Sequence, residues 1–303
     1  MNEYHCYEVA VVAFSGSSQS VLEWGGRLRT YNEGVDVEVN HELIQKLDLD
    51  YKRTFSRMET MDWGYLFWNT ANPSHYDANH AWILSSPING KTVIDEVTQF
   101  YGSKGIVPRF YIYDLDQKLR FIQELEKHEF KIETFVDPIQ LWTGELVAVK
   151  ENHDVKIEEV TTENFEDAAQ VEFSIPEFGG REVRRKAFEE EFRSSRFNHY
   201  LLRYHDEPIA TACIFESGGD ARMESVATLK EFRGRGFIKQ LIRHIQRETQ
   251  RLGHKHLWVF PIDEEIEQVY RKCGFRTVGR LTNGHAYMSG RGIHEIRQAA
   301  RNE

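Results

Sequence analysis

A glycine-bearing turn, Arg233-Gly234-Arg235-Gly236, lies between a strand-like segment at 222–228 and a long amphipathic helix at 236–251. Apolar residues recur through the helical segment at the spacing of one helix face. At such a strand–turn–helix junction, unpaired backbone N–H groups and the positive end of the helix dipole favour an anion. The two glycines allow the backbone to approach phosphate oxygens closely, and the two arginines add positive charge. The turn therefore predicts a phosphate-binding loop.

The segments around this turn alternate between strand and helix patterns, which indicates an α/β fold of the α+β type. In the second half we expect strands at 155–160, 200–204, 209–215, 222–228, 256–260, 275–279 and 285–288, a helix opened by a hydroxyl cap at Thr162, and helices at 181–193, 236–251 and 264–272. The first half repeats this order more faintly, with strands at 63–68, 81–84, 109–113, 132–136 and 139–142 and helices at 93–101 and 118–128.

The two halves also share a local pattern. The segments 125–130 and 270–275 both end a helix and carry a Lys and a Phe in register. We interpret the halves as a diverged internal duplication, although a matched element order can arise by chance. A change to polar sequence at 143–154 places the boundary between domains of 1–145 and 146–303, as the length of 303 residues favours.

Composition excludes several classes of protein. A net charge of −10 argues against general nucleic-acid binding, including RNA contact through the Arg-Gly repeat. Three widely spaced cysteines without a CxxC motif indicate reduced thiols. The apolar run at 9–14 is too short for a signal or membrane segment, so we expect a cytoplasmic protein without a membrane partner. The spacing of His75 and His80 suits neither a helix face nor a strand face, so no metal is expected.

The segment 221–275 resembles the GNAT superfamily of acetyl-CoA-dependent N-acetyltransferases. Arg233-x-x-Gly236 matches the family loop R/Q-x-x-G-x-G/A, although Ile238 stands where the family has a small residue. The segment 270–275 is similar to the late family motif Y-x-K-x-G-F, and Asp263 replaces an Asn common seven residues before the Tyr. The resemblance implies two tandem GNAT-like domains, each with a mixed, mostly antiparallel central sheet flanked by helices.

The resemblance also implies how acetyl-CoA is bound as co-substrate. The residues that follow from it are Val226, Ala227, Thr228, Arg233, Gly234, Arg235, Gly236, Phe237 and Ile238. Backbone N–H groups of 226–228 would stabilise the oxyanion, with 257–260 as the pairing strand. The acetyl group would pass directly to a primary amine of a small molecule or peptide.

Two side chains are candidates for the proton transfers. In the resembled family a Tyr at the place of Tyr270 is the general acid, and a phenol of pKa about 10 stays protonated at neutral pH; the alternative is a core tyrosine. Glu224 shares a strand face with Val226 and Thr228, so it is a candidate general base. An ion pair between Glu224 and Arg222 is an equal alternative.

The first half lacks these features. Its equivalent turn, 85–91, has no Arg-x-x-Gly, and Leu125 stands in the place of Tyr270. We therefore expect a degenerate, structural or substrate-shaping domain, in which the segment 63–82 with His75, Asp77, Asn79 and His80 helps to form an acceptor pocket. The resemblance implies that the chain is an acyltransferase transferring groups other than aminoacyl groups. The alternative is a CoA-binding sensor or scaffold without turnover, which Ile238 favours. The oligomeric state stays open.

Overall fold

The first half of the chain builds strands and helices in alternation. A computed structural model describes residues 21–24, 27–30, 39–175, 178–295 and 298. The elements of the first half are β1 (Val21–Trp24), β2 (Arg27–Thr30), β3 (Val39–Asn40), α1 (His41–Lys52), β4 (Arg57–Met61), β5 (Gly64–Trp68), η1 (Tyr76–Ala78), β6 (His80–Ile83), α2 (Gly90–Gly102), β7 (Arg109–Ile112), η2 (Leu115–Lys118), α3 (Leu119–Lys127) and β8 (Lys131–Trp142). The run expected at 9–14 lies outside the described residues.

The second half repeats the alternation with longer strands. Its elements are β9 (Val155–Glu159), α4 (Phe165–Phe173), α5 (Arg181–Arg193), β10 (Phe197–Tyr204), β11 (Glu207–Ser217), β12 (Asp220–Thr228), η4 (Lys230–Phe232), α6 (Phe237–Arg251), β13 (Leu257–Val259), α7 (Glu264–Arg271) and β14 (Phe275–Tyr287). Among the described residues, no helix has the length and apolar character needed to cross a membrane.

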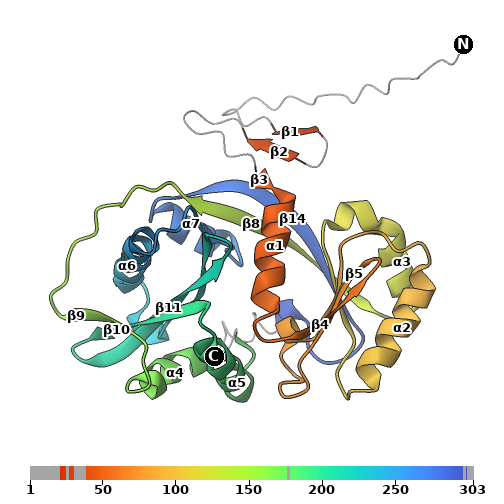
Figure 1. Ribbon diagram of the computed structural model, residues 1–303, viewed down its shortest axis with the longest axis horizontal. Helices are drawn as coiled ribbons and strands as arrows, with labels where there is room; N and C mark the ends of the chain where they lie inside the picture. The colour runs from red at the N-terminus through yellow and green to blue at the C-terminus, as the bar shows by residue number, and fades with distance from the viewer. Residues whose placement is uncertain (1–20, 25–26, 31–38, 176–177, 296–297, 299–303) are drawn as a thin grey trace, which may run out of the picture.

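One 11-stranded sheet runs through both halves (Figure 1). Its strand order is β4-β5-β6-β7-β14-β8-β13-β12-β11-β10-β9. Neighbouring strands are antiparallel except at β6–β7 and β12–β13, one parallel pair in each half. Each half therefore has one parallel pair among antiparallel strands, and the expectation of tandem domains with mixed, mostly antiparallel sheets is confirmed.

The halves exchange their last strands. Strands β8 and β14 pair along their whole length, from Phe275↔Trp142 to Tyr287↔Lys131. The end of β8 also pairs with β13 of the second half, and the end of β14 pairs with β7 of the first half. Each half thus completes the sheet of the other.

This exchange corrects two expectations from the sequence. The strands expected at 132–136 and 139–142 are one continuous strand, and so are those at 275–279 and 285–288. Pro138, which lies between the two expected strands, is part of the ladder opposite Arg280. Strand β13 reaches only Gln140 and Leu141, so the missing N–H of Pro138 has no strand to face on that side.

One local expectation was wrong, and two others hold with ends shifted by one residue. The helix expected from Thr162 begins at Phe165, and its N-cap Asn164 makes no side-chain cap bond because its Oδ1 accepts the N–H of Thr161. The helix expected at 118–128 is present as α3, and the 3-10 turn η2 precedes it. The strand expected at 256–260 is shortened to β13.

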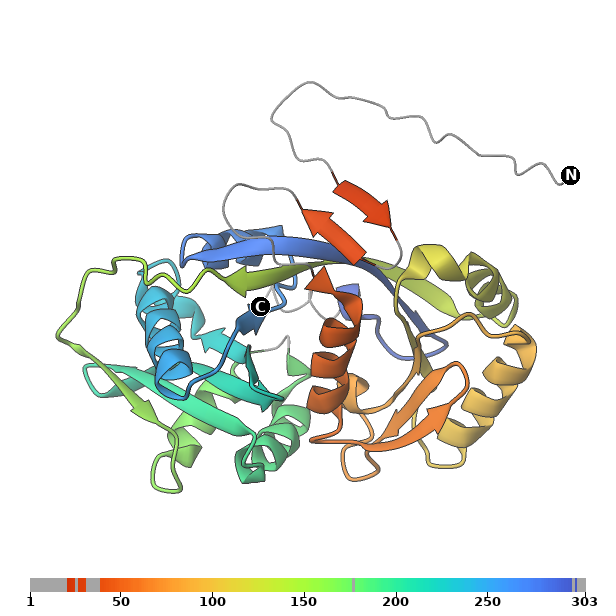
Figure 2. The ribbon, with the colours of Figure 1, turned by 45° about the horizontal axis from the view of Figure 1, so that its top comes forward.

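Helices cover both faces of the sheet. In β10, Tyr200 and Leu202 pack with α6 and α7, whereas Leu201 between them packs with α4 and α5, because successive strand residues point to opposite faces. In the first half, α2 and α3 cover one face. Helix α1 lies between the halves in both ribbon views, where Ile44 and Leu47 enter a third core with residues of both halves (Figures 1 and 2).

Candidate functional site

Strand β12 leaves its parallel neighbour β13 after two residue pairs. Ala221 pairs with Leu257 and Arg222 with Trp258, and no later pair between these strands is found among the described residues. The expectation that 226–228 pairs with 257–260 is therefore wrong. The two strands instead diverge, and the edge of β12 that faces β13 is left open beyond Arg222.

A β-bulge at Ser225 sets the direction of this open edge. Cys213 lies opposite Glu224, but Thr211 lies opposite Ala227, so β12 has one extra residue here, and Ser225 has a φ of 52°. After the bulge, the N–H of Leu229 donates to the carbonyl of Ile209 in β11. Strand backbones alternate in direction, so the N–H groups of residues 226 and 228 point to the open edge.

A buried ionic network holds both sides of the bulge. The Arg184 guanidinium donates to Glu172 at 2.8 Å, to both oxygens of Glu191 at 2.8 Å and to the Ser225 hydroxyl at 3.0 Å. On the other strand, the Thr211 hydroxyl donates to the second oxygen of Glu172 at 2.8 Å. All three charged side chains are at most 5% exposed. Helices α4 and α5 thus clamp the bulge from beneath the sheet.

The turn between β12 and α6 presents a row of free amides. Gly234 and Gly236 have φ values of 74° and 83°, which a side chain disfavours. The N–H groups of residues 234–238 donate to no other group in the described part of the chain, whereas that of Lys239 already donates to the carbonyl of Gly236. Five consecutive amides at a helix N-terminus form an anion site.

The side chains around the turn are exposed or face the core. Arg233 donates from Nε to the carbonyl of Thr228 at 2.9 Å, and both it and Arg235 are exposed. The Arg235 guanidinium lies 5.0 Å from the ring of Phe237 and 5.1 Å from that of Tyr204. Ile238 packs against the core formed with β10–β12. The side chain that replaces the small residue of the family loop is therefore in apolar contact with this core.

Tyr270 is buried in α7 at 6% exposure. Its ring meets that of Phe275 at 5.7 Å, and its hydroxyl makes no hydrogen bond within the described residues. Burial raises the pKa of Tyr270, and the negative charge of Glu224 adds to the effect. The phenol is therefore held in its protonated form and lies within electrostatic range of Glu224.

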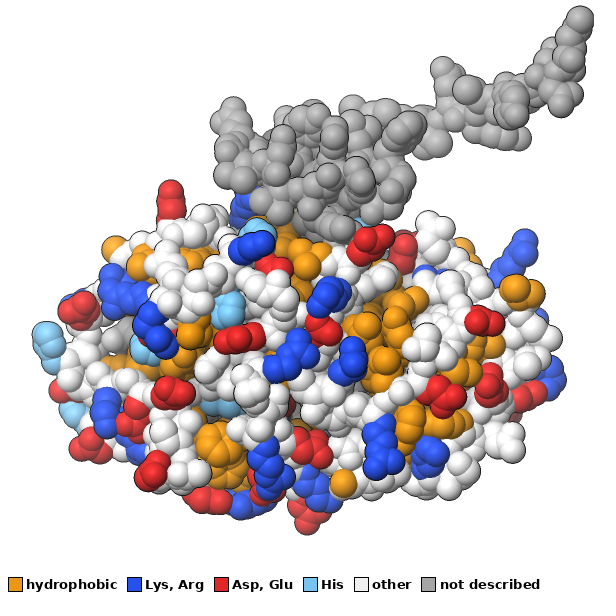
Figure 3. Space-filling model, in the orientation of Figure 1, with side chains coloured by type: hydrophobic (Ala, Val, Ile, Leu, Met, Phe, Trp, Pro, Cys, Tyr) orange, Lys and Arg blue, Asp and Glu red, His pale blue; other side chains and the backbone are white. Residues whose placement is uncertain are grey.

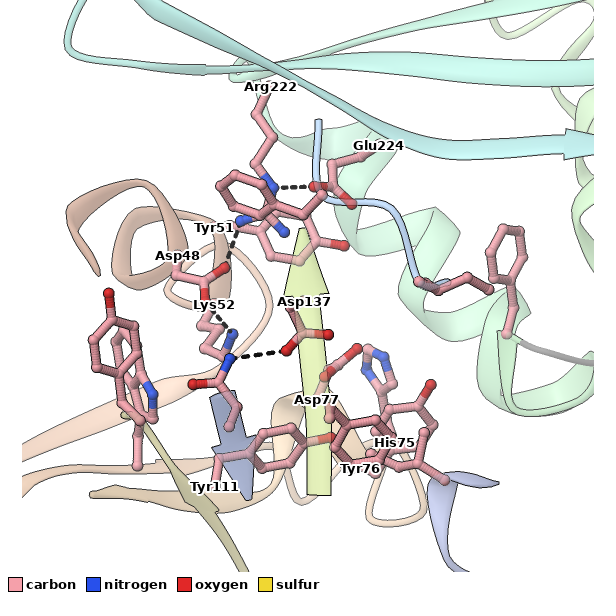
Figure 4. A pocket seen from close by; sticks show the side chains of 18 of the residues that line it. Asp48, Tyr51, Lys52, His75, Tyr76, Asp77, Tyr111, Asp137, Arg222 and Glu224 are labelled. Atoms are coloured by element: carbon pink, nitrogen blue, oxygen red, sulfur yellow. Dashed lines mark hydrogen bonds and ion pairs between the residues drawn. The ribbon is translucent and has the colours of Figure 1, made fainter. Parts of the chain in front are cut away.

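A cavity of about 310 Å³ opens beside the bulge, and both halves line it (Figure 4). The second half contributes Arg222, Glu224 and Ser225 from β12 and Phe260 after β13. The first half contributes side chains from α1, η1, β6, β7 and β8, including the expected His75 and Asp77. Asn79 and His80 are buried elsewhere: Asn79 bonds the backbone of Asn72 and His75, and His80 that of Tyr76.

Glu224 is ion-paired at the edge of this cavity. It contacts the guanidinium of Arg222, which also contacts Asp48 of α1. Lys52 lies 3.5 Å from the same Asp48. Burial raises the pKa of Glu224 in spite of the opposing charge of Arg222. The ion pair offered as an alternative is therefore present, and Glu224 still faces the cavity.

Three further titratable residues, His199, His285 and Cys273, do not line this cavity. Burial lowers the pKa of His199 to about 4, and His285 is bound between Glu133 and Arg109 in the first half's sheet. Cys273 is buried with its pKa raised to about 11. Within the described ranges, no group of three or more His, Cys, Asp or Glu side chains is placed to hold a metal ion.

The equivalent junction of the first half has no open strand edge and no glycine-bearing turn of the kind at 233–236. Strands β6 and β7 stay paired over three residues, from Ala81↔Phe110 to Ile83↔Ile112. The helix that follows, α2, is capped by Asn89, whose side chain accepts the N–H of Thr92. Leu125 is fully buried in the core beneath α3.

Sequence reasoning missed α1 and the clamp. Asp48, Tyr51 and Lys52 of α1 line the cavity, and the helical spacing of Ile44, Leu47 and Tyr51 is a signal that could have revealed this helix. Arg184 was read only as part of a charged helix, and nothing local marks it as buried.

The outer surface differs in character from the cavity. On the face drawn in Figure 3, the basic and acidic side chains of the described residues are interspersed, without a continuous basic field. This face has no electrostatic footprint for nucleic acid.

Comparison with known proteins gives a family match and several structural likenesses. Residues 162–275 match the model of the acetyltransferase (GNAT) family. No curated protein matches the chain in sequence. A GCN5-related N-acetyltransferase from Kribbella flavida shares 15% identity at a TM-score of 0.59, covering 84% of this chain and 97% of its own.

Two further solved structures cover most of the chain. A functionally unknown conserved protein from Staphylococcus epidermidis shares 11% identity at a TM-score of 0.62, covering 78% of this chain and 95% of its own. A GCN5-related N-acetyltransferase-like protein from Streptococcus suis shares 10% identity at a TM-score of 0.53, covering 81% and 97%. At such identities the likeness establishes the fold.

Proposed function

We propose that this chain, whose residues 162–275 match the model of the acetyltransferase (GNAT) family, moves an acetyl group from acetyl-CoA to a primary amine of a small molecule or peptide. The observation that carries the proposal is the junction of β12 and α6. Five unbonded amides at 234–238 stand beside an open strand edge, and a cavity lies next to that edge. This arrangement supports neighbouring sites for a pyrophosphate, a thioester and an acceptor.

The amides and cations of the turn would bind the CoA pyrophosphate. The N–H groups of residues 226 and 228, directed to the open edge by the bulge, would donate to the thioester oxygen as it gains negative charge. The amine nitrogen attacks the carbonyl carbon, the N–C bond forms, and the C–S bond breaks. Preorganised donors cost no reorganisation during this step, so the bulge contributes directly to the rate.

Two protons must move in this reaction. The ammonium proton of the acceptor would leave through Glu224 or a water beside it, since Glu224 lines the cavity and its pKa is raised by burial. The departing thiolate would take a proton from Tyr270, whose buried phenol is held protonated. Glu224 thus acts as the base and Tyr270 as the acid.

We assign catalysis to the domain 146–303 and the shaping of the acceptor pocket to the domain 1–145. The first half supplies α1, η1 and strand residues to the cavity wall, yet its own β6–β7 junction is closed. One CoA per chain follows from this division.

A second reading is a CoA-binding sensor or scaffold without turnover. Ile238 in place of a small residue and the ion pair between Glu224 and Arg222 are the observations that favour it. Turnover separates the two readings, because both require the CoA loop.

The decisive experiment joins turnover with a matched pair of glycine variants. Thiol release from acetyl-CoA is followed with a panel of amines, and CoA binding is measured by calorimetry in Gly236→Val and Gly253→Val. Both glycines have positive φ, 83° and 76°, and at neither would an added Cβ meet an atom within 4 Å. The backbone penalty should therefore be similar, about 1–2 kcal/mol.

Only Gly236→Val should lose CoA binding, and the unsubstituted protein should bind one CoA per chain. Unchanged CoA affinity in folded Gly236→Val would remove the loop assignment, and a stoichiometry of two would overturn the division between the halves. CoA binding without thiol release from any amine would favour the sensor.

A further inference from the structure

The cavity beside β12 is walled largely by aromatic side chains. Tyr51, Trp82, Tyr111, Phe135 and Phe260 line it from five different elements or loops. Aromatic faces attract cations, by about 0.5–2 kcal/mol for each contact. One cation already uses this wall: the Arg222 guanidinium lies 4.6 Å from the ring of Tyr51 and 4.5 Å from that of Phe260. The wall therefore suits an organic cation.

The basic side chains of the cavity are already neutralised. Each has carboxylate partners: Arg184 with Glu172 and Glu191, Arg222 with Asp48 and Glu224, and Lys52 with Asp48. Four carboxylates thus form ion pairs with these three basic side chains. A ligand carboxylate would have to displace one of them, whereas a ligand cation meets no such competition.

Asp77 stands apart from this pairing. Its carboxylate lines the cavity, yet it makes no hydrogen bond or ion pair with any residue that the structure describes. Figure 4 places it with Asp137 at the side of the cavity away from Glu224. His75 of the same turn also lines the cavity, and its buried Nδ1 has no hydrogen-bond partner among the described residues. Among the residues that the structure describes, Asp77 therefore has no positively charged partner at this end of the cavity.

We propose that the acceptor is a small amine with a second cationic group, which Asp77 binds while the reacting amine lies at the Glu224 end. This inference rests on the proposed acetyl transfer and names its substrate class. A cavity of about 310 Å³ is at the small end of ligand sites, so the acceptor is a small molecule rather than a peptide. The aromatic wall covers the chain between the two cations.

The reaction changes only one end of such an acceptor. The reacting ammonium loses a proton at the Glu224 end, forms the amide and becomes neutral, whereas the second group keeps its charge. Asp77 therefore acts as a positioning and specificity-determining residue, and its removal should raise KM for the doubly charged acceptor.

The test compares 1,4-diaminobutane with n-butylamine, which differ by one ammonium group. Thiol release is measured for the unsubstituted protein, for Asp77→Asn, and for Asp95→Asn as a control on the exposed face of α2. We expect the unsubstituted protein to prefer the diamine by at least about tenfold in kcat/KM. Asp77→Asn should remove this preference through KM, leaving n-butylamine and acetyl-CoA unaffected, and Asp95→Asn should change neither.

Binding of 1,4-diaminobutane by calorimetry makes the test independent of turnover. Binding that is weakened about tenfold by Asp77→Asn supports the inference even if no acetyl group is transferred, a result that would remove the proposed function alone. Turnover of both amines at equal kcat/KM, or a preference unchanged by Asp77→Asn, would overturn the inference and leave acetyl transfer standing. Tighter binding of an amine that carries a carboxylate would also overturn it.

Discussion

Removing one hydroxyl group tests whether the buried ionic network of Arg184, Glu172 and Glu191 holds the bulge in place. Thr211 is 2% exposed, and its Oγ1 donates to Glu172 at 2.8 Å. Valine has nearly the same shape without the donor, so Thr211→Val removes the hydrogen bond and leaves no cavity. Of its hydrogen-bond partners among the described residues, Glu172 would keep Arg184.

The magnitude follows from the burial of Glu172. A hydrogen bond to a charged group contributes about 1.5–3 kcal/mol, and Glu172 is fully buried with its pKa already raised by burial. We therefore expect Thr211→Val to lower the free energy of unfolding by about 1.5–3 kcal/mol. Because Arg184 also binds Ser225, the bulge should loosen, and kcat should fall by about tenfold or more as the amides of β12 lose alignment.

Urea unfolding and steady-state kinetics measure the two effects. Thr211→Ser keeps the hydroxyl and should restore most of kcat, while CoA affinity should stay the same in both variants because the amide turn is separate from the clamp. A Thr211→Val protein within about 0.5 kcal/mol of the unsubstituted one would show that the bond is not stabilising. A loss of stability with unchanged kcat would refute the link between clamp and catalysis.

Two further changes address the acid and the pH dependence. Tyr270→Phe should lower kcat by roughly 10²- to 10⁴-fold with little change in KM for acetyl-CoA, since it removes only the proton that the phenol donates, and near-normal turnover of the folded variant would leave the ring a packing role. Burial works to raise the pKa of Glu133, but hydrogen bonds from His285 and from the amides of Ile293 and His294 outweigh it and hold the pKa at about 2, against the usual 4.5. The stability that this lowered pKa contributes is present above pH 4.5 and is lost as the pH falls towards 2. Glu133→Gln should therefore flatten that part of an acid-unfolding curve and lower the free energy of unfolding at pH 7 by roughly 3 kcal/mol at most. An unchanged curve would contradict the assignment.

Local sequence patterns, such as helical periodicity and glycines at turns, determined the main helices and strands and the turn before α6. The periodicity of α6, the glycines at 234 and 236 and the strand before them identify a strand–turn–helix junction, and the structure has one with positive φ at both glycines. Gly253 follows the last turn of α6 with a φ of 76°, a conformation that glycine favours at the end of a helix. These features depend on residues within a few positions of one another, so a single sequence carries them.

The tertiary structure decided what surrounds the turn. Pairing between the distant strands β8 and β14 made both continuous, β8 across Pro138, and exchanged the last strands of the two halves. The bulge at Ser225 depends on Arg184, and the cavity depends on α1. The alternation of side chains in β12 looks regular in the sequence, because an extra strand residue shows only against its partner strand. Likewise, the side chains of the first half that pack near Glu224 decide whether it pairs with Arg222 alone or can also contact an acceptor. The spacing of residues along the chain does not encode this packing.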